Sequence, residues 1–410
     1  MAEFAYKGRA AGGDLVSGTL QGDSPDAVAS RLLDLGITPV DIQSVKKRGG
    51  GMDVGELWRQ MGGGNPTTKD LILFCRQMYT ITKSGLPLLR GLNGLIESTH
   101  NIVLREALED VTSSLESGRG LAASFGRHPR IFPRLFVSIV EMGEATGTLD
   151  TAFQRMYEYL SMDQDIRDRV KSAVRYPIIV LVAIGIAIAI ITLFVIPNFE
   201  PIFRALGDDI PLPTRIIMGA SDVAVNHWPL ILVFMAALAV GTSLFVRTES
   251  GRYKWDRIKL QIPGTGSIVR NAALSRIARS LAVALEAGLP INQTLAIIAT
   301  GTGNSFLGER VLKMRDGVER GEALVRTARA ADLFPPLVLQ MVGLGEETGA
   351  LPELMHEAAD FYQREVDYDL ENLSAAIEPI LIIAIGGIVL VLALGVFLPM
   401  WDMVSKARGM

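Results

Sequence analysis

The chain has 410 residues, a formal net charge of −4 and a pI near 5.7. Its hydrophobic content of 49% and mean hydropathy of +0.30 exclude an ordinary soluble protein of this length. The acidic balance offers no general basic face for nucleic acid. A single cysteine, Cys75, rules out an intramolecular disulfide and agrees with a reducing compartment.

Residues 1–45 predict a small α/β module that is too short to bury much core alone. The expected elements are strands over 4–7 and 16–20, a helix over 27–35 and a strand over 38–45. The first residues lack the apolar core and cleavage site of a signal peptide, so we expect a cytoplasmic N-terminus. A glycine-rich stretch over 46–66 predicts a flexible linker, with a possible short helix over 54–61.

From about residue 74 the chain repeats itself, with an offset of about 202 residues. The landmarks of the first copy are Arg76, 84–87, 132–133, 143–147, Pro177 and Pro197, and those of the second are Arg279, 287–290, 334–335, 345–349, Pro379 and Pro399. Apolar residues at three- and four-residue spacing predict helices in each copy. We therefore expect two homologous helical bundles, over 67–175 and 247–375, in a mainly α membrane protein.

Each copy carries a glycine–glutamate motif, GEATG over 143–147 and GEETG over 345–349. Its candidate functional residues are Gly143, Glu144 and Gly147 in the first copy, and Gly345, Glu346 and Gly349 in the second. Glycines at both ends are also what a tight connection between two helices requires, and the acids suit a capping or solvated position. Both interpretations, a structural turn and a partner contact, stay open from the sequence.

Three stretches without Asp, Glu, Lys or Arg, over 176–199, 223–246 and 379–401, are long enough to cross a bilayer as helices, and we expect the third helix to span 376–401. Basic residues before the first stretch and after the second place both bundles in the cytoplasm and 200–222 on the periplasmic side, with a short periplasmic tail over 402–410. Acidic residues before the third stretch and Lys406 and Arg408 after it run against this orientation, which the first two stretches decide. Pro177 and Pro379 lie where a bundle helix would enter the membrane, and a proline kinks a continuous helix.

The sequence carries no motif of catalysis. It has no phosphate-binding loop of the G-x-x-x-x-G-K-[ST] type, and its four histidines are never paired at metal-ligand spacing. Asp163, Asp165 and Asp168 lack the glycine and glutamate of a calcium loop and are better interpreted as one charged helix face. We therefore expect a protein that is not an enzyme and depends on a partner for energy. A rival interpretation is an oligomeric transporter or channel component, although the spans carry no charge that would mark an ion path.

The duplicated module, its Gly-Leu-Pro helix ends, its Phe-Pro and Gly-Glu-x-Thr-Gly motifs, and Leu212-Pro-Thr-Arg between the spans resemble the type II secretion F and type IV pilus platform family. The resemblance covers nearly the whole chain. Segments 74–79, 361–370, 376–381 and 397–402 look most like the mannose-sensitive haemagglutinin pilus subgroup.

The resemblance implies a multi-pass inner-membrane platform protein of a bacterium. Its implied partners are a hexameric assembly ATPase, pilins or pseudopilins, other inner-membrane assembly proteins, membrane lipid and further copies of itself, without nucleic acid. Arg76, Arg279 and the two glycine–glutamate motifs are the candidate partner contacts. No cofactor is implied, apart from calcium bound by a relative, for which Glu97, Glu144 and Asp150 are weak candidates here.

Overall fold

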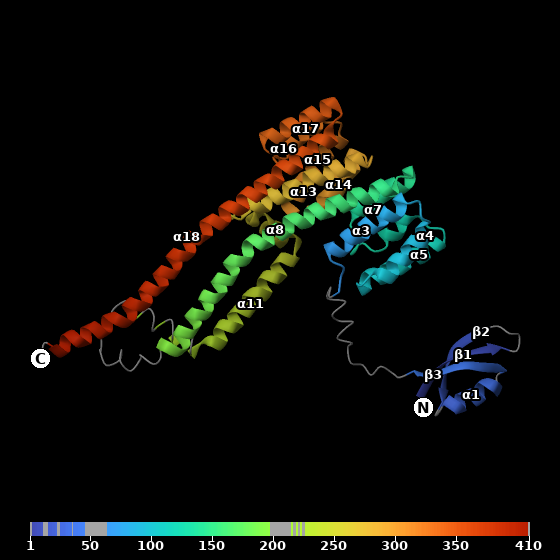
Figure 1. Cartoon of the computed structure of the whole chain (residues 1–410), viewed down its shortest axis with the longest axis horizontal. Coiled ribbons are helices and arrows are strands. Elements are labelled where there is room, and N and C mark those ends of the chain that lie inside the picture. Colours follow the sequence, from blue (N-terminus) through green and yellow to red (C-terminus); the bar gives the residue numbers. More distant parts are fainter. Residues whose placement is uncertain are drawn as a thin grey trace. The chain divides into compact units, whose positions relative to one another are not determined.

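The computed structural model describes residues 2–10, 15–22, 25–34, 36–45, 64–196, 215, 219, 222–223 and 226–408. It separates into two compact units, Met1–Asn65 and Pro66–Met410, and is mainly helical (Figure 1). Most of the predicted linker and of the predicted periplasmic segment lies outside the described residues, as does Pro197. The backbone of Pro399 is described but its side chain is not.

The first unit is a three-stranded antiparallel sheet with one helix. Its elements are β1 (Ala2–Ala10), β2 (Leu15–Gly22), α1 (Pro25–Asp34) and β3 (Ile37–Val45). The strand order is β2-β1-β3, and the register shifts between Lys7 and Gly8 where β1 pairs with β3. Val28 and Leu32 of α1 are fully buried and pack with Leu20 and Ile37. This unit agrees with the small α/β module expected from the sequence.

The second unit contains the duplication as two bundles with the same order of helices. The first bundle is formed by α3 (Thr68–Lys83), α4 (Leu88–Ser98), α5 (Ile102–Glu116), α6 (Leu121–Gly126), α7 (Arg134–Thr146) and α8 (Leu149–Ile190). The second is formed by α13 (Gly266–Glu286), α14 (Ile291–Gly301), α15 (Ser305–Glu319), α16 (Leu324–Ala330), α17 (Pro336–Thr348) and α18 (Leu351–Arg408). The mainly helical fold with two homologous bundles is confirmed.

Equivalent side chains begin and end equivalent helices. The Asn101 side chain accepts a hydrogen bond from the Leu104 amide at 3.0 Å, and the Asn304 side chain accepts one from the Leu307 amide at 3.0 Å. Each satisfies an amide that the first turn of its helix leaves without a backbone partner. Gly85 and Gly288 follow α3 and α13 with φ of 70° and 87°, a conformation that other residues adopt at a cost.

The two cores differ although the folds match. The first contains five clustered phenylalanine rings, Phe74, Phe125, Phe132, Phe136 and Phe153, and the centroids of neighbouring rings are 4.6 to 6.4 Å apart. The equivalent positions of the second are Ile277, Ala328, Phe334, Val338 and Met355, all buried. The first core therefore contains an aromatic cluster, and the second has non-aromatic side chains at all but one of the equivalent positions.

Each bundle continues into a long apolar helix. α8 is one helix of 42 residues that π-helical residues Ile191–Val195 extend, and α18 is one helix of 58 residues. α11 (Trp228–Arg247) lies between the bundles in the chain, and α12 (Glu249–Lys259) follows it. Three of the described helices, α8 with its extension, α11 and α18, are long and apolar enough to cross a membrane.

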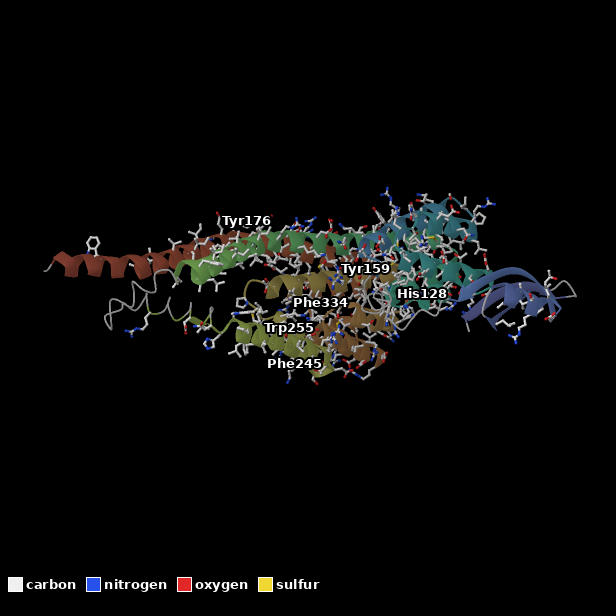
Figure 2. All side chains as sticks on the ribbon, turned by 90° about the horizontal axis from the view of Figure 1, so that it is seen from below. His128, Tyr159, Tyr176, Phe245, Trp255 and Phe334 are labelled. Atoms are coloured by element: carbon white, nitrogen blue, oxygen red, sulfur yellow. The ribbon has the colours of Figure 1, made fainter. Side chains whose placement is uncertain are left out.

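The membrane-capable parts of α8, α11 and α18 extend to one side of the bundles (Figure 1). Exposed aromatic side chains mark the region where bundle gives way to apolar helix, among them Tyr176 of α8, Phe245 of α11 and Trp255 of α12 (Figure 2). Aromatic side chains of this kind favour the interface between lipid and water. Pro177 lies inside α8 and Pro379 inside α18, so neither proline ends its helix.

The single cysteine gives a probe of the first bundle. Cys75 is 0% exposed, and burial raises the pKa of its thiol, so we expect no labelling by maleimide in the folded protein. Phe136→Ala should destabilise the first bundle by about 3–5 kcal/mol because it removes a ring from the packed cluster. The measurement is the denaturant concentration at which Cys75 of the detergent-solubilised chain becomes labelled. Val338→Ala, the equivalent change in the second bundle, is the matched control and should shift the midpoint much less.

Candidate functional site

The glutamates of the two glycine–glutamate motifs bind the starts of neighbouring helices. The Glu144 carboxylate accepts hydrogen bonds from the amides of Leu121 at 2.6 Å and Ala122 at 3.0 Å. The Glu346 carboxylate accepts them from Leu324 at 2.6 Å and Val325 at 3.1 Å. α6 and α16 begin after Gly120 and Ala323, which have no side-chain acceptor. A carboxylate from α7 or α17 therefore supplies the cap and complements the helix dipole.

The motif glycines allow α7 and α8, or α17 and α18, to meet closely. A Cβ at Gly143 would stand 2.7 Å from the Ala152 Cβ, and one at Gly345 would stand 2.8 Å from the Leu351 Cα. Gly147 and Gly349 end α7 and α17 with φ of 74° and 76°. A side chain at any of these positions would clash or strain the turn.

The geometry thus favours the structural interpretation of both motifs. Each candidate residue of the motifs has a structural role inside its own bundle, as a helix cap, at a close approach of two helices or in a turn with positive φ. Contact with a partner stays a prediction, since Glu144 and Glu346 remain exposed at the surface.

The two landmark arginines have different surroundings. Arg279 is 5% exposed and donates hydrogen bonds from α13 to Asp360 at 2.7 Å and Gln363 at 3.1 Å on α18. Arg76 is exposed on α3. Burial makes Arg279 a link between two helices of its own bundle, which leaves Arg76 as the surface residue of the pair.

The metal candidates do not form a common set of ligands. Among the residues that the structure describes, no three His, Cys, Asp or Glu side chains gather closely enough to hold a metal ion. Glu144 instead caps α6, and Glu97 and Asp150 lie near the end of α4 and the start of α8.

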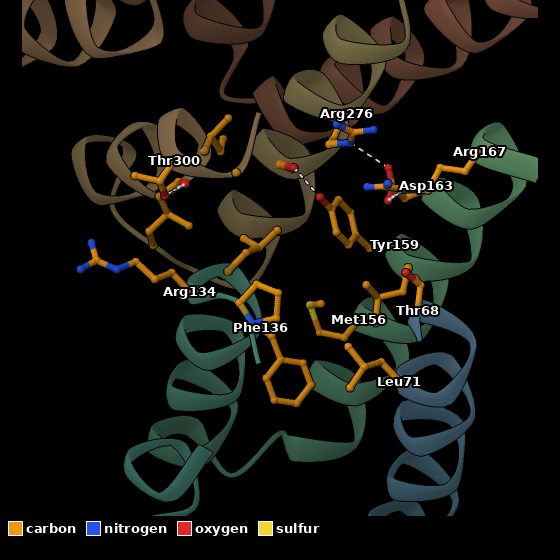
Figure 3. Close-up of a pocket in the computed structure, with 17 residues that line it drawn as sticks. Thr68, Leu71, Arg134, Phe136, Met156, Tyr159, Asp163, Arg167, Arg276 and Thr300 are labelled. Carbon is orange, nitrogen blue, oxygen red and sulfur yellow. Dashed lines mark hydrogen bonds and ion pairs between the residues drawn. The ribbon is translucent and has the colours of Figure 1, made fainter. Parts of the chain in front are cut away.

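A polar network and a cavity of about 290 Å³ lie between the two bundles (Figure 3). Tyr159 and Asp163 of α8 point toward the second bundle, where the Ser280 hydroxyl donates to the Tyr159 hydroxyl at 3.1 Å. The Asp163 carboxylate accepts from Arg276 of α13 at 2.7 Å and from Arg167 at 2.8 Å. Arg276 also donates to the Thr302 carbonyl at 3.1 Å.

Burial by itself raises the pKa of Asp163, but the guanidinium groups of Arg276 and Arg167 outweigh it and hold the pKa below 3.8. Burial raises the pKa of the Tyr159 phenol, which therefore stays neutral. The carboxylate is thus charged at neutral pH and ties the bundles together through ionic hydrogen bonds. Nothing in this network resembles a nucleophile with its base.

The sequence-based interpretation of one charged face over 163–168 is wrong for Asp163. Its side chain is 13% exposed and faces the second bundle, whereas the Asp165 and Asp168 side chains are 66% and 46% exposed. A signal was present in the repeat, because Arg276 stands where the first copy has Leu73. A cation appearing in only one copy indicates a contact that only this copy makes.

Two sequence families cover most of the chain. The family described as type II secretion system (T2SS), protein F matches residues 74–197 and again 277–399. Its N-terminal domain family matches residues 1–43. The chain belongs to the type II secretion system protein F family. The two matched ranges of this F-family protein coincide with the two copies of the duplicated module, each from the bundle into the apolar helix.

Relatives of this F-family protein cover its whole length. It is 35% identical over 407 residues to the type IV pilus assembly protein PilC of Thermus thermophilus, which is 99% of both chains. It is 31% identical over 408 residues to PilC of Myxococcus xanthus, covering 99% of this chain and 96% of the relative. It is also 28% identical over 406 residues to the type II secretion system protein F of Vibrio cholerae, covering 98% of each.

Glu144→Ala should lower the stability of the first bundle by about 1–2 kcal/mol, because two amides at the start of α6 lose their acceptor. The labelling midpoint of Cys75 in denaturant measures this loss. Glu141→Ala changes an exposed acid one turn earlier on α7 and should leave the midpoint in place. An equal effect of both substitutions would contradict the capping role.

Asp163→Asn should loosen the contact between the bundles at neutral pH. A carboxyl whose folded pKa is depressed stabilises the fold above its unfolded pKa and loses that effect as the pH falls through the folded value. The deficit of the variant is therefore full at pH 7 and shrinks below about pH 4. The measurement is Tm by circular dichroism at pH 7 and at pH 3. Asp165→Asn is the matched control, and the idea fails if the two variants show the same loss at pH 7.

Proposed function

We propose that this protein is the inner-membrane platform of a type IV pilus or type II secretion assembly machine. In this role it couples a cytoplasmic hexameric ATPase to the extraction of pilin or pseudopilin subunits from the membrane. Membership of the F family and the names of the full-length relatives support the class of machine. The observation that carries the mechanism is that both bundles continue without a break into a helix able to cross the bilayer.

We place both bundles and the N-terminus in the cytoplasm, with three crossings of the membrane. Lys171 and Arg175 lie on α8 directly before its apolar part, and Arg247 and Arg252 follow the apolar part of α11. Basic residues close to a span stay on the cytoplasmic side. The first two spans then require the third, α18, to leave the cytoplasm in the same direction as α8.

Continuous helices suit the transmission of motion. α8 and α18 each remain helical through the proline near the start of the apolar part, so displacement of a bundle shifts the attached span. We call the parts of α8 and α18 between the bundle cores and the apolar spans the stems. The two stems are joined, because Arg169 of α8 forms an ion pair with Asp367 of α18 at 2.7 Å. Close to that pair in the chain, Ile166 packs with Val366 and Leu370. A motor acting on one bundle therefore moves both long helices together.

A test of the contact with the ATPase has to use residues that do not also hold the bundle together. Glu144→Lys or Glu346→Lys is a poor test, since either would also remove the cap of α6 or α16. Glu347, within the second motif, and Arg76, on α3, are exposed, and substitutions at these two positions separate recognition from folding. The filament that we propose is of the mannose-sensitive haemagglutinin type, on the sequence resemblance alone.

We propose neither catalysis nor transport for this protein. The apolar parts of α8 and α11 carry no charged side chain from Tyr176 to Val195 and from Trp228 to Val246. A path for ions or polar solutes through these helices has no support in the sequence.

Inserting Gly-Ser-Gly-Ser after Ala173 should abolish filament assembly, because it breaks α8 between the bundle and the span. Membrane insertion and co-purification with an assembly ATPase of the same cell should persist. The same insertion after Gly264, in the turn before α13, interrupts no helix and is the matched control. Assembly is scored by surface pili or secreted substrate in a strain that lacks the wild-type gene.

Assembly that survives the α8 insertion would refute the lever mechanism. Failure of the wild-type protein to co-purify with any assembly ATPase, in native membranes as well as in detergent, would refute the platform role itself.

A further inference from the structure

The contact between the two bundles joins two different surfaces. α7 and α8 of the first bundle contact α13 and α14 of the second. We call the first surface the front face, which includes Leu135, Met142 and Arg155. We call the second surface the back face, which includes Glu286 and Leu289. Because the bundles are homologous, the second bundle also has a front face and the first bundle also has a back face.

Within the described part of the second unit, Pro66–Met410, no other element covers the apolar residues of these two remaining faces. Leu135 of the first front face is 8% exposed, whereas its equivalent Leu337 is 49% exposed. Leu289 of the second back face is 3% exposed, whereas its equivalent Leu86 is 40% exposed. A two-fold relation between the bundles would have covered both pairs equally. The relation is therefore head to tail, with one free face of each kind at the two ends.

A second apolar position behaves in the same way. The terminal methyl group of Met142 lies 3.5 Å from where a Cβ at Gly288 would stand, which puts α7 against the turn after α13. The equivalent of Met142 is Leu344, which is 53% exposed on α17. The equivalent of Gly288 is Gly85, in the exposed turn beside Leu86. The free faces thus keep the apolar residues of the contact on both sides.

The ion pair of the contact has a counterpart on the two free faces, in which the acid and the base have changed places. Within the chain, Arg155 of the front face lies 3.6 Å from Glu286 of the back face. The equivalents of these two residues are Glu357 and Lys83, and both are exposed. A contact in the same register between the free faces would again bring an acid and a base together. A change of sign on both sides leaves the faces complementary.

The membrane permits this arrangement. α8 and α18 leave their bundles toward the same side of the second unit (Figure 1). The rotation and translation that carry the first bundle onto the second therefore keep the direction of the membrane helices. A second copy placed by that operation directs its own helices into the same bilayer.

We propose that the front face of the second bundle, with Leu337, Leu344 and Glu357, docks on the back face of the first bundle of another copy, with Lys83 and Leu86. The contact repeats between chains the contact that the chain makes within itself. Because the contact is head to tail, each copy leaves one face free for the next copy. Copies therefore add one after another until the rotation from copy to copy closes a ring. Each added copy contributes two quasi-equivalent bundles.

The contact between copies is weaker than the one within the chain. Asp163 and Arg276 have the equivalents Glu365 and Leu73, which form no ion pair. Farther along the stems, Arg169 and Asp367 have the equivalents Glu371 and Asp165, which are both acidic. Docking is therefore confined to the bundle faces, and the copies can separate while each chain stays folded.

The first test measures self-association of the full chain. Two copies with different tags are co-expressed, solubilised in detergent and purified by one tag, and the recovery of the other is measured. Leu344→Asp and Leu86→Asp, each introduced in both copies, should lower recovery about tenfold or more, since each places a charge in an apolar contact. Ile102→Asp changes a residue of α5 that is 46% exposed and outside both faces, and should leave recovery unchanged. Recovery unaffected by either leucine variant would overturn the proposal.

The second test is independent of any loss of folding. Lys83→Glu and Glu357→Lys, introduced singly, place like charges opposite each other and should lower recovery several-fold at low salt. The double variant restores an ion pair and should return recovery to the wild-type level. A double variant that associates no better than the single ones would show that these faces do not meet.

Discussion

The structure depends on the continuity of α8 and α18, each of which runs as one helix from bundle to apolar span although Pro177 and Pro379 each lack the amide for one backbone hydrogen bond. Lipid offers no hydrogen-bond partner to amides and carbonyls, so an apolar span has to pair nearly all of them within its own helix, which favours a regular helix. Here the regularity begins well before the bilayer, at Leu149 and Leu351, where the same helices bury Phe153 and Met355 in the two cores. Position in the membrane and packing of the bundle are therefore two properties of one rigid element. The remaining helices of each bundle pack around the start of that element.

The contact between the bundles adds the second constraint. It combines apolar burial, with Val283, Ala284 and Leu289 joining the core of the first bundle, and the ionic hydrogen bonds of Asp163 with Arg276. Removal of either partner of this largely buried charge pair would leave the other charge unpaired, which is costly. α8 provides both Asp163 and the first span. The position of one bundle relative to the other therefore also fixes the position of α8 relative to α18.

The sequence predicted the duplication, the helical bundles, the apolar spans and the turn chemistry of Gly147 and Gly349, because these features depend on local pattern. It left the role of Glu144 open, since the amides that Glu144 binds lie more than 20 residues earlier in the chain. It misjudged Asp163 for a related reason. Helical periodicity places that carboxylate on the same side as other acids, and only the fold shows that Arg276 approaches it from another bundle. Contacts between distant segments leave no periodic trace, although a departure from the repeat at Leu73 and Arg276 was a usable hint.

The two bundles also show which positions tolerate change after a duplication. Core residues need only fill a volume, so rings at Phe74 and Phe136 could give way to Ile277 and Val338 with compensation by neighbours. Corner residues must meet a hydrogen-bond direction or a positive φ, so Asn101 and Asn304, or Gly147 and Gly349, remain identical. Between the two copies, core positions have therefore changed more than the positions of caps and turns. In such a protein, the cap and turn residues are the positions at which a duplication stays detectable longest.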